Sequence, residues 1–234
     1  MIPWEHLDST QVPGDGQEMT LHRRDKEFSI RVGGLELMNS RVYGSEEALA
    51  ELACAKIKDR AGARVLIGGL GMGYTVSAAL GLLDAKARVQ VAELVPAVVD
   101  WNRKYLAHLA GHPLKDRRVT IKVMDVAQII RSASSISGRE AYGREGFDAI
   151  LLDVDNGPDG LTRKSNNWLY TQSGLGAAHA ALRPGGVLAV WSAGVDTVFI
   201  KRLRKAGFKV EEHRVRARGS RGGSRYTVWI AMRV

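Results

Sequence analysis

One stretch of the sequence constrains the fold more than any other. It begins with Val65–Ile67, a short apolar run of the kind that forms a buried parallel strand. A glycine-rich loop, GGLGMG, follows at once over residues 68–73. The small residues of 76–83 then predict a helix, and a second apolar strand, 89–93, ends on an acid. This order of strand, loop, helix, strand and acid predicts the core of a parallel α/β sheet.

The same stretch indicates that the sheet binds a nucleoside. Side chains in the loop would keep such a ligand away from the backbone, and four glycines, Gly68, Gly69, Gly71 and Gly73, remove them. Glu93, which follows at about the spacing of 20 residues expected for such sites, can accept hydrogen bonds from both ribose hydroxyls. No Lys-Ser or Lys-Thr pair follows the loop, which excludes a Walker-type phosphate loop. The alternative is a tight turn and a surface glutamate.

Acids also follow the ends of two later predicted strands. Asp125 comes after the strand 119–123, where it can accept the adenine amino group, cap the next helix, or do both. Asp153 and Asp155 follow the buried strand 147–152, at the edge where catalytic groups of open α/β sheets lie. Asp153 is the stronger candidate because it stands directly at the strand end. The alternative for both is turn chemistry, since Asn, Gly and Pro come next.

The residues before the glycine loop predict a small separate sheet. The first 17 residues are polar, contain Pro and Gly, and are expected to form a loose leader. Residues 19–38 alternate apolar and polar around a Gly-Gly pair, which is typical of an antiparallel meander. A helix is expected next, with Ser45 as its N-cap and with Glu46 and Glu47 near its positive end.

The C-terminal part predicts the rest of the large sheet. A helix over 171–182 and a turn over 183–186 lead into a parallel strand at 187–191. A second, amphipathic helix begins at Asp196. The chain then ends in a long hairpin, with strands over 208–215 and 226–234.

The length of 234 residues suits one medium domain with a small appendage. We expect two domains, a leader with the small meander in 1–44 and a Rossmann-like nucleoside-binding domain in 45–234. The single cysteine, Cys54, excludes a disulfide within the chain, and no metal site is expected. The cysteine content fits a reducing compartment, so a cytoplasmic protein is expected. No apolar run approaches the ~20 residues of a membrane span, so no membrane partner is expected.

The charge of the chain is concentrated near its end. The excess of Lys and Arg over Asp and Glu within residues 201–234 equals the whole net charge of +9. Arg216, Arg218, Arg221 and Arg225 lie among glycines between the last two strands. Such a loop can neutralise the phosphates of a nucleic acid, but it is also commonly solvated or paired with its neighbours. No run of aromatic residues accompanies it, which makes RNA modification a minor alternative.

The order of the elements resembles the class I S-adenosylmethionine-dependent methyltransferase fold, and the LRPGGVL run at 182–188 is similar to the turn before its fifth strand. More narrowly, the chain resembles the spermidine synthase family of polyamine aminopropyltransferases. The meander before the glycine loop and the Asp153 loop ending in Gly-Pro carry this narrower likeness. The resemblance implies an α/β fold with a mostly parallel seven-stranded sheet, a terminal antiparallel hairpin and a small N-terminal β-meander.

The family resemblance also implies roles for individual residues. Gly69, Gly71 and Glu93 would hold the ribose and amino-acid part of S-adenosylmethionine or a derivative, and Asp125 would bind the adenine amino group. Asp153 would be the catalytic carboxylate that helps to bind and deprotonate an attacking amine. The family further implies a homodimer.

The sequence departs from the family in the half of the site that binds the amine. A Tyr-His pair in the first helix is replaced by Leu49-Ala50, the family's Asp-Ser-Ser-Asp-Pro becomes DVDNGP at 153–158, and a glutamine is missing at Leu37-Met38. These departures favour methyl transfer to an unidentified small acceptor. The alternative is aminopropyl transfer from decarboxylated S-adenosylmethionine to putrescine or a similar amine. An RNA methyltransferase and a non-catalytic ligand-binding protein are further alternatives.

Overall fold

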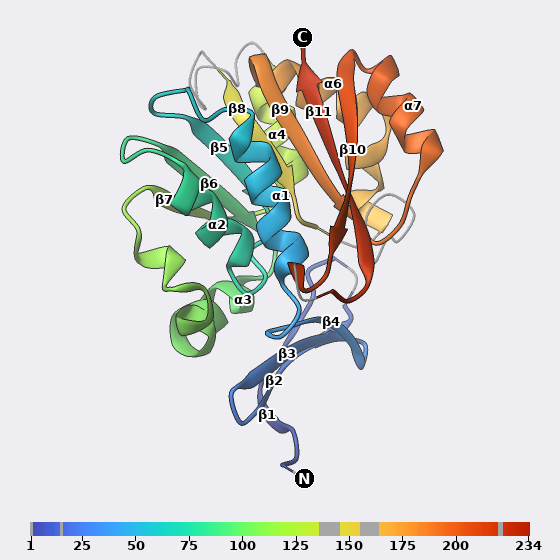
Figure 1. The fold of residues 1–234 in the computed structure, drawn as a ribbon. Helices are drawn as coiled ribbons and strands as arrows, with labels where there is room; N and C mark the ends of the chain where they lie inside the picture. Colours follow the sequence, from blue (N-terminus) through green and yellow to red (C-terminus); the bar gives the residue numbers. More distant parts are fainter. Residues whose placement is uncertain (1, 15, 136–145, 155–163, 220–221) are drawn as a thin grey trace.

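The computed structural model describes residues 2–14, 16–135, 146–154, 164–219 and 222–234. These residues form a four-stranded sheet and a seven-stranded sheet. The small sheet lies beneath the large one in Figure 1, and the N-terminus projects from its far end. The division into domains at residue 44 stays a prediction, although the change from one sheet to the other falls close to it.

The small sheet is an antiparallel meander in which each strand pairs with the next. Its strands are β1 (Glu5–Gln11), β2 (Glu18–Arg24), β3 (Glu27–Val32) and β4 (Leu35–Asn39). The prediction of a loose leader is wrong, because β1 is an edge strand whose Asp8 accepts a hydrogen bond from the Trp101 indole at 2.8 Å. Most of β1 is exposed, so the alternation of apolar and polar residues that marks a half-buried strand is missing.

The large sheet has the strand order β10-β11-β9-β8-β5-β6-β7. Its strands are β5 (Arg64–Gly68), β6 (Arg88–Glu93), β7 (Val119–Val123), β8 (Phe147–Leu152), β9 (Leu182–Ser192), β10 (Phe208–Arg216) and β11 (Arg225–Arg233). Strands β5 to β9 run parallel, and β11 is inserted antiparallel between β9 and β10. This arrangement confirms the predicted methyltransferase-like fold.

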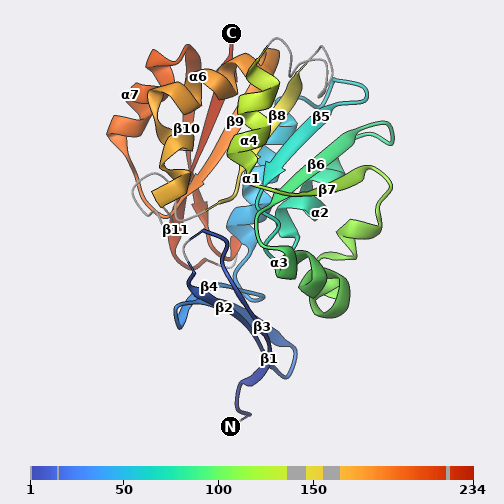
Figure 2. The same cartoon turned by 180° about the vertical axis from the view of Figure 1, so that it is seen from behind.

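Helices cover both faces of the large sheet. Figure 1 shows α1 (Gly44–Ala55), α2 (Tyr74–Leu82) and α3 (Pro96–Trp101) in front of it, and Figure 2 shows α4 (Val126–Ser134), α6 (Gln172–Ala181) and α7 (Thr197–Lys205) on the other side. Successive residues of β5 serve the two faces, since Val65 and Ile67 join one apolar cluster and Leu66 the other. None of the helices in the described ranges is long and apolar enough to cross a membrane.

Two local predictions are wrong. Ser45 does not cap α1, because Tyr43 takes the N-cap position and the Ser45 hydroxyl donates instead to the Glu46 carboxylate at 2.6 Å. The turn expected over 183–186 is part of strand β9, whose pairing with β8 shifts register after Phe147. This irregularity in the ladder accommodates Gly185 at a φ of 68° within the strand, which is why the glycines resemble a turn in the sequence.

Candidate active site

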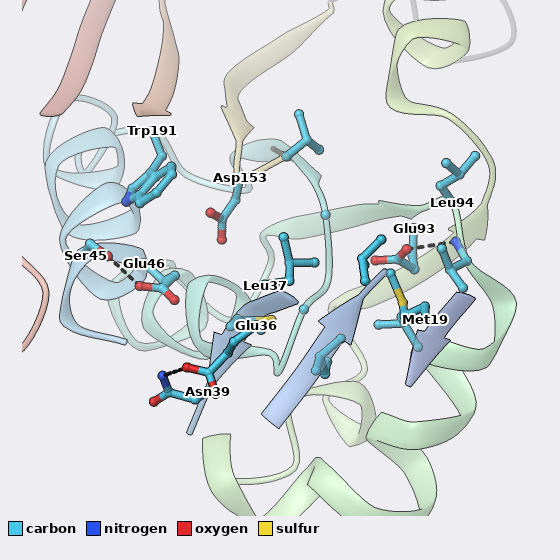
Figure 3. Close-up of a pocket in the computed structure, with 18 of the residues that line it drawn as sticks. Met19, Glu36, Leu37, Asn39, Ser45, Glu46, Glu93, Leu94, Asp153 and Trp191 are labelled. Atoms are coloured by element: carbon cyan, nitrogen blue, oxygen red, sulfur yellow. Dashed lines mark hydrogen bonds between the residues drawn. The ribbon is translucent and has the colours of Figure 1, made fainter. Parts of the chain in front are cut away.

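A cavity of about 720 Å³ lies between the carboxyl edge of the large sheet and the small sheet (Figure 3). The segments that follow β5, β6, β8 and β9 line it on one side, together with the first turn of α1. The small sheet and the residue that follows β1 supply an apolar floor, made of Val12, Met19, Ile30, Val32, Leu37 and Met38. Both sheets are therefore needed to enclose the cavity.

The glycine loop forms one wall of the cavity through Gly69 and Gly71. Gly69 has a φ of 90°, and a Cβ atom there would collide with the backbone carbonyl oxygen of Asp153. Gly71 has a φ of 51°, and its Cβ would meet the side chain of Met38 from the small sheet. The Asn102 side chain fixes the loop by donating to the Gly71 carbonyl at 2.7 Å. The loop thus brings bare backbone to the cavity.

The other two glycines of the motif do not line the cavity. Gly68 has no side chain, and this leaves room for Val126 of α4. A Cβ atom on residue 68 would lie only 3.0 Å from the Val126 side chain. Gly73 takes the N-cap position of α2 with a φ of 89°. Their contacts are structural, and a direct contact with a ligand stays a prediction.

Glu93 ends β6 and lines the cavity, with an exposed fraction of 7%. One carboxylate oxygen accepts the Leu70 N–H at 2.9 Å, and the other accepts the Val95 N–H at 2.8 Å. Burial raises the pKa of Glu93, while these backbone hydrogen bonds act in the opposite direction. The backbone N–H groups of Leu94 and Gly71 also act on this carboxylate, and a hydrogen bond from a ribose hydroxyl stays a prediction.

Asp125 does what the capping alternative predicts. Its carboxylate accepts the Ala127 N–H at 2.8 Å at the start of α4. Asp125 follows β7 at the same edge of the sheet as Glu93, but it is not among the residues that line the cavity. A contact with adenine stays a prediction. Asp155 lies outside the described residues.

Asp153 follows β8 and lines the cavity beside the glycine loop. Its backbone N–H donates to the Gly68 carbonyl at 3.0 Å, and its carboxylate accepts the buried Thr75 hydroxyl of α2 at 2.6 Å. Burial raises the pKa of Asp153, and the hydrogen bond from Thr75 partly opposes that rise. These contacts fix the orientation of the carboxyl group at the mouth of the sheet.

Glu46 is a site residue that the sequence patterns did not identify. It lies in the first turn of α1, lines the cavity, and stands on the same side of it as Asp153 in Figure 3. Burial raises the pKa of Glu46, and the charge of Asp153 raises it further. In the sequence Glu46 is one of two adjacent acids at a helix start, which is common, so only the packing of α1 reveals its place.

The cavity is acidic in a basic protein. Its described lining contains the acids Glu36, Glu46, Glu93 and Asp153, and it contains no Lys, Arg or His. The chain as a whole carries a net charge of +9. Carboxylates that share a poorly hydrated space repel each other unless a cation or protons compensate them. The lining therefore favours a positively charged ligand.

Two aromatic side chains also line the cavity. Trp191 from β9 and Tyr226 from β11 have ring centroids 4.9 Å apart. The buried indole nitrogen of Trp191 has no hydrogen-bond partner among the described residues. The faces of such rings attract cations, which agrees with the charge of the lining.

The basic hairpin lies beside α1. Arg216 and Arg225 pair across β10 and β11, and Arg216 and Arg218 border a separate cavity of about 470 Å³ with Glu47 and Glu51. Arg221 lies outside the described residues. The proximity of these arginines to acids of α1 agrees with the alternative of local charge compensation. A role in nucleic-acid binding stays a prediction.

The raised pKa of Glu46 predicts that the free protein is less stable at higher pH. Burial and Asp153 raise that pKa to about 7, from an ordinary value of about 4.5. Between these values the folded protein holds a proton that the unfolded chain has released, so the free energy of unfolding falls as the pH rises. Between pH 5 and pH 8 the free energy of unfolding of the wild type should therefore fall by about 1–3 kcal/mol through Glu46. Glu46→Gln should lack this decrease, because the amide does not titrate.

Urea denaturation at both pH values measures this effect. Glu47→Gln is the matched control, because Glu47 is the next residue of the same helix and does not line the cavity. The same pH dependence in the wild type and in both variants would contradict the assignment of the raised pKa to Glu46.

Comparisons with known proteins identify the family of the chain. The family model for the spermine/spermidine synthase domain matches residues 44–204. Two similar solved structures are the spermidine synthase from Thermotoga maritima and a spermidine synthase in complex with the transition state analogue AdoDATO. In each case the TM-score is 0.71 at 18% identity, covering 98% of this chain and 72% of the other, so the likeness shows the fold. No individual curated protein matches the chain significantly. The chain therefore belongs to the spermine/spermidine synthase family.

Proposed function

We propose that the protein is an aminopropyltransferase, which moves the aminopropyl group of decarboxylated S-adenosylmethionine to an amine acceptor. The observation that carries this proposal is the acidic cavity at the sheet edge, with Glu93 at one side and Asp153 and Glu46 at the other (Figure 3). The family assignment indicates a transferase. Both substrates of aminopropyl transfer are cations. The described lining has carboxylates at both sides of the cavity, so each substrate can lie near an acid.

The same charges argue against methyl transfer, which the departures from the family pattern favour. S-adenosylmethionine carries an α-carboxylate, which is stabilised by a nearby cation and destabilised by nearby acids. No Lys, Arg or His stands in the described lining to receive it, and the acids there would repel it. Decarboxylated S-adenosylmethionine lacks this group and keeps only positive charges. The residues that bind the amine in the family are therefore replaced in this chain, but the cavity is still lined by carboxylates that can bind an amine.

The nucleoside half of the proposed site follows from the residues that face the cavity. Gly69 and Gly71 allow the ligand to approach the backbone, and backbone N–H groups orient the Glu93 carboxylate at the cavity, where it would accept the ribose hydroxyls. The adenine role of Asp125 and the homodimer implied by the resemblance belong to the same proposal. In this proposal the small acceptor is an amine, and RNA is not a substrate.

The residues near Asp153 suit the transfer step. The acceptor enters as an ammonium and must lose one proton before its nitrogen has a lone pair for the attack. The nitrogen then forms a bond to the aminopropyl carbon, the bond from that carbon to sulfur breaks, and the electron pair stays on sulfur. The products are 5′-methylthioadenosine, a substituted ammonium and the proton released before the attack. Asp153 takes that proton in the proposal, and its raised pKa makes the carboxylate a better base than an exposed aspartate. The cavity walls hold the two substrates together and limit the access of water.

Product analysis tests the proposed function. The purified protein is incubated with decarboxylated S-adenosylmethionine and putrescine, and the products are identified by mass spectrometry. We expect 5′-methylthioadenosine and the aminopropylated diamine in equal amounts. A parallel reaction contains S-adenosylmethionine itself. Methylated amine and S-adenosylhomocysteine in that reaction, with no 5′-methylthioadenosine in the first, would overturn the proposal in favour of methyl transfer.

A further inference from the structure

We propose that Glu46 binds the ammonium group of the acceptor together with Asp153, and that this carboxylate pair selects cationic amines. The inference rests on the proposed function for its reaction, but binding of an amine tests it separately. The pair joins two distant parts of the chain, the first turn of α1 and the end of β8, at one side of the cavity. It supplies acidic groups in the half of the site where the sequence departs from the family pattern.

The surroundings of Glu46 do not explain it as a structural residue. Its carboxylate accepts a hydrogen bond from the adjacent Ser45 hydroxyl at 2.6 Å. Within the described ranges no Lys, Arg or His forms an ion pair with it, whereas Glu5 and Glu27 of the small sheet and Glu211 of β10 each have such a partner. Among the charged groups that act on Glu46, Asp153 has the largest effect, and it repels the carboxylate. A half-buried acid beside another acid, without a cation, is costly to ionise unless a ligand supplies the opposite charge.

The position of the pair separates an acceptor side from a nucleoside side. In Figure 3 Glu46, Asp153 and Trp191 lie toward one side of the cavity, while Glu93 and Leu94 lie toward the other. Trp191 adds an aromatic wall near the two acids. An acceptor that occupies this side would place its nitrogen next to Asp153, the group that removes the proton during transfer.

Titratable groups from three elements lie near Glu46 and influence how the charge of the pair changes with pH. Glu46 interacts with Asp153 after β8, with Glu47 on α1 and with Tyr74 on α2. A cationic amine favours the ionised form of both acids, so it binds more tightly as the pH rises through their titration. Removal of Glu46 should weaken the pH dependence of amine binding, because only one acid of the pair then remains.

Kinetics and direct binding together test the inference. Putrescine is titrated into the wild type, Glu46→Gln, Glu46→Asp and Glu47→Gln by calorimetry at pH 6 and pH 8, and KM is measured for both substrates. In Glu46→Gln we expect the Kd and KM for the amine to rise about 10–100-fold at pH 8, as for loss of one charged hydrogen bond, with the KM for decarboxylated S-adenosylmethionine nearly unchanged. Glu46→Asp should recover part of the affinity. Glu47→Gln should stay close to the wild type, because the charge of Glu47 affects Glu46 less than that of Asp153 does.

The outcomes distinguish this inference from the proposed function. If the wild type binds putrescine and Glu46→Gln does not, the inference stands even where no aminopropyl transfer is detected. If Glu46→Gln binds the amine as tightly as the wild type, with the same pH dependence, the inference is overturned. Equal increases in the KM of both substrates would also overturn it, because they would show a general disturbance of the site. Absence of amine binding to the wild type would have the same consequence.

Discussion

Replacement of Asp153 by Asn is expected to lower kcat about 10²–10⁴-fold, the usual contribution of a general base. The amide keeps the size of the carboxyl group and can still accept the hydrogen bond from Thr75, so the local structure should be retained. It cannot take the proton that the acceptor nitrogen releases. The measurement is kcat with saturating amine and decarboxylated S-adenosylmethionine, followed by release of 5′-methylthioadenosine.

Two controls show whether this loss concerns catalysis. The thermal midpoint of Asp153→Asn at pH 8 should equal or exceed that of the wild type, because a poorly hydrated charge has been removed. Binding of 5′-methylthioadenosine should also be retained, since Glu93 and the glycine loop are unchanged. A variant that keeps kcat within about threefold of the wild type would exclude Asp153 as the base, given the range expected for that role.

Replacement of Gly69 by Ala is expected to destabilise the folded protein by about 3 kcal/mol or more, through backbone strain and overpacking. At a φ of 90° an alanine is strained, and its Cβ atom would collide with the carbonyl oxygen of Asp153. That oxygen belongs to the backbone, so it cannot move without displacing the end of β8. Urea denaturation measures the loss, and titration with 5′-methylthioadenosine should show weaker binding in any protein that remains folded.

Gly176→Ala is the matched control for this substitution. Gly176 lies in the middle of α6, where a Cβ atom would meet nothing within 4 Å. Alanine favours a helix more than glycine does, so this variant should gain about 0.5–1 kcal/mol. Similar stabilities for the two variants would contradict the close approach of Gly69 to Asp153.

Local pattern was sufficient to predict most of the large sheet and part of the site. The apolar run at 65–67, the glycines after it and the acid at the end of β6 are near each other in the sequence, and their spacing follows from one strand, one loop and one helix. Asp153 was predictable because the ends of parallel strands meet at the same edge of a sheet. The structure brings Gly69, Gly71, Glu93 and Asp153 to one cavity.

The rest of the site depends on packing between distant segments. Glu46 and Asp153 come together only because α1 packs near the carboxyl end of β8, and no local pattern encodes that contact. Strand β1 was missed for a related reason, since its exposed residues lack the alternation that a buried face imposes. At Asp125 the sequence predicted a cap and a ligand role together, and only the cap is a contact within the chain.

The floor of the cavity has a consequence for how this protein can change over time. Met19, Ile30 and Met38 come from the small sheet, whereas the match to the family model begins only at residue 44. The groups proposed to perform the transfer stand on one sheet, and much of the surface that limits the shape of the substrates stands on the other. Substitutions in the floor can therefore alter which amine fits while leaving the reacting groups in place, so substrate choice and reaction chemistry are free to diverge separately.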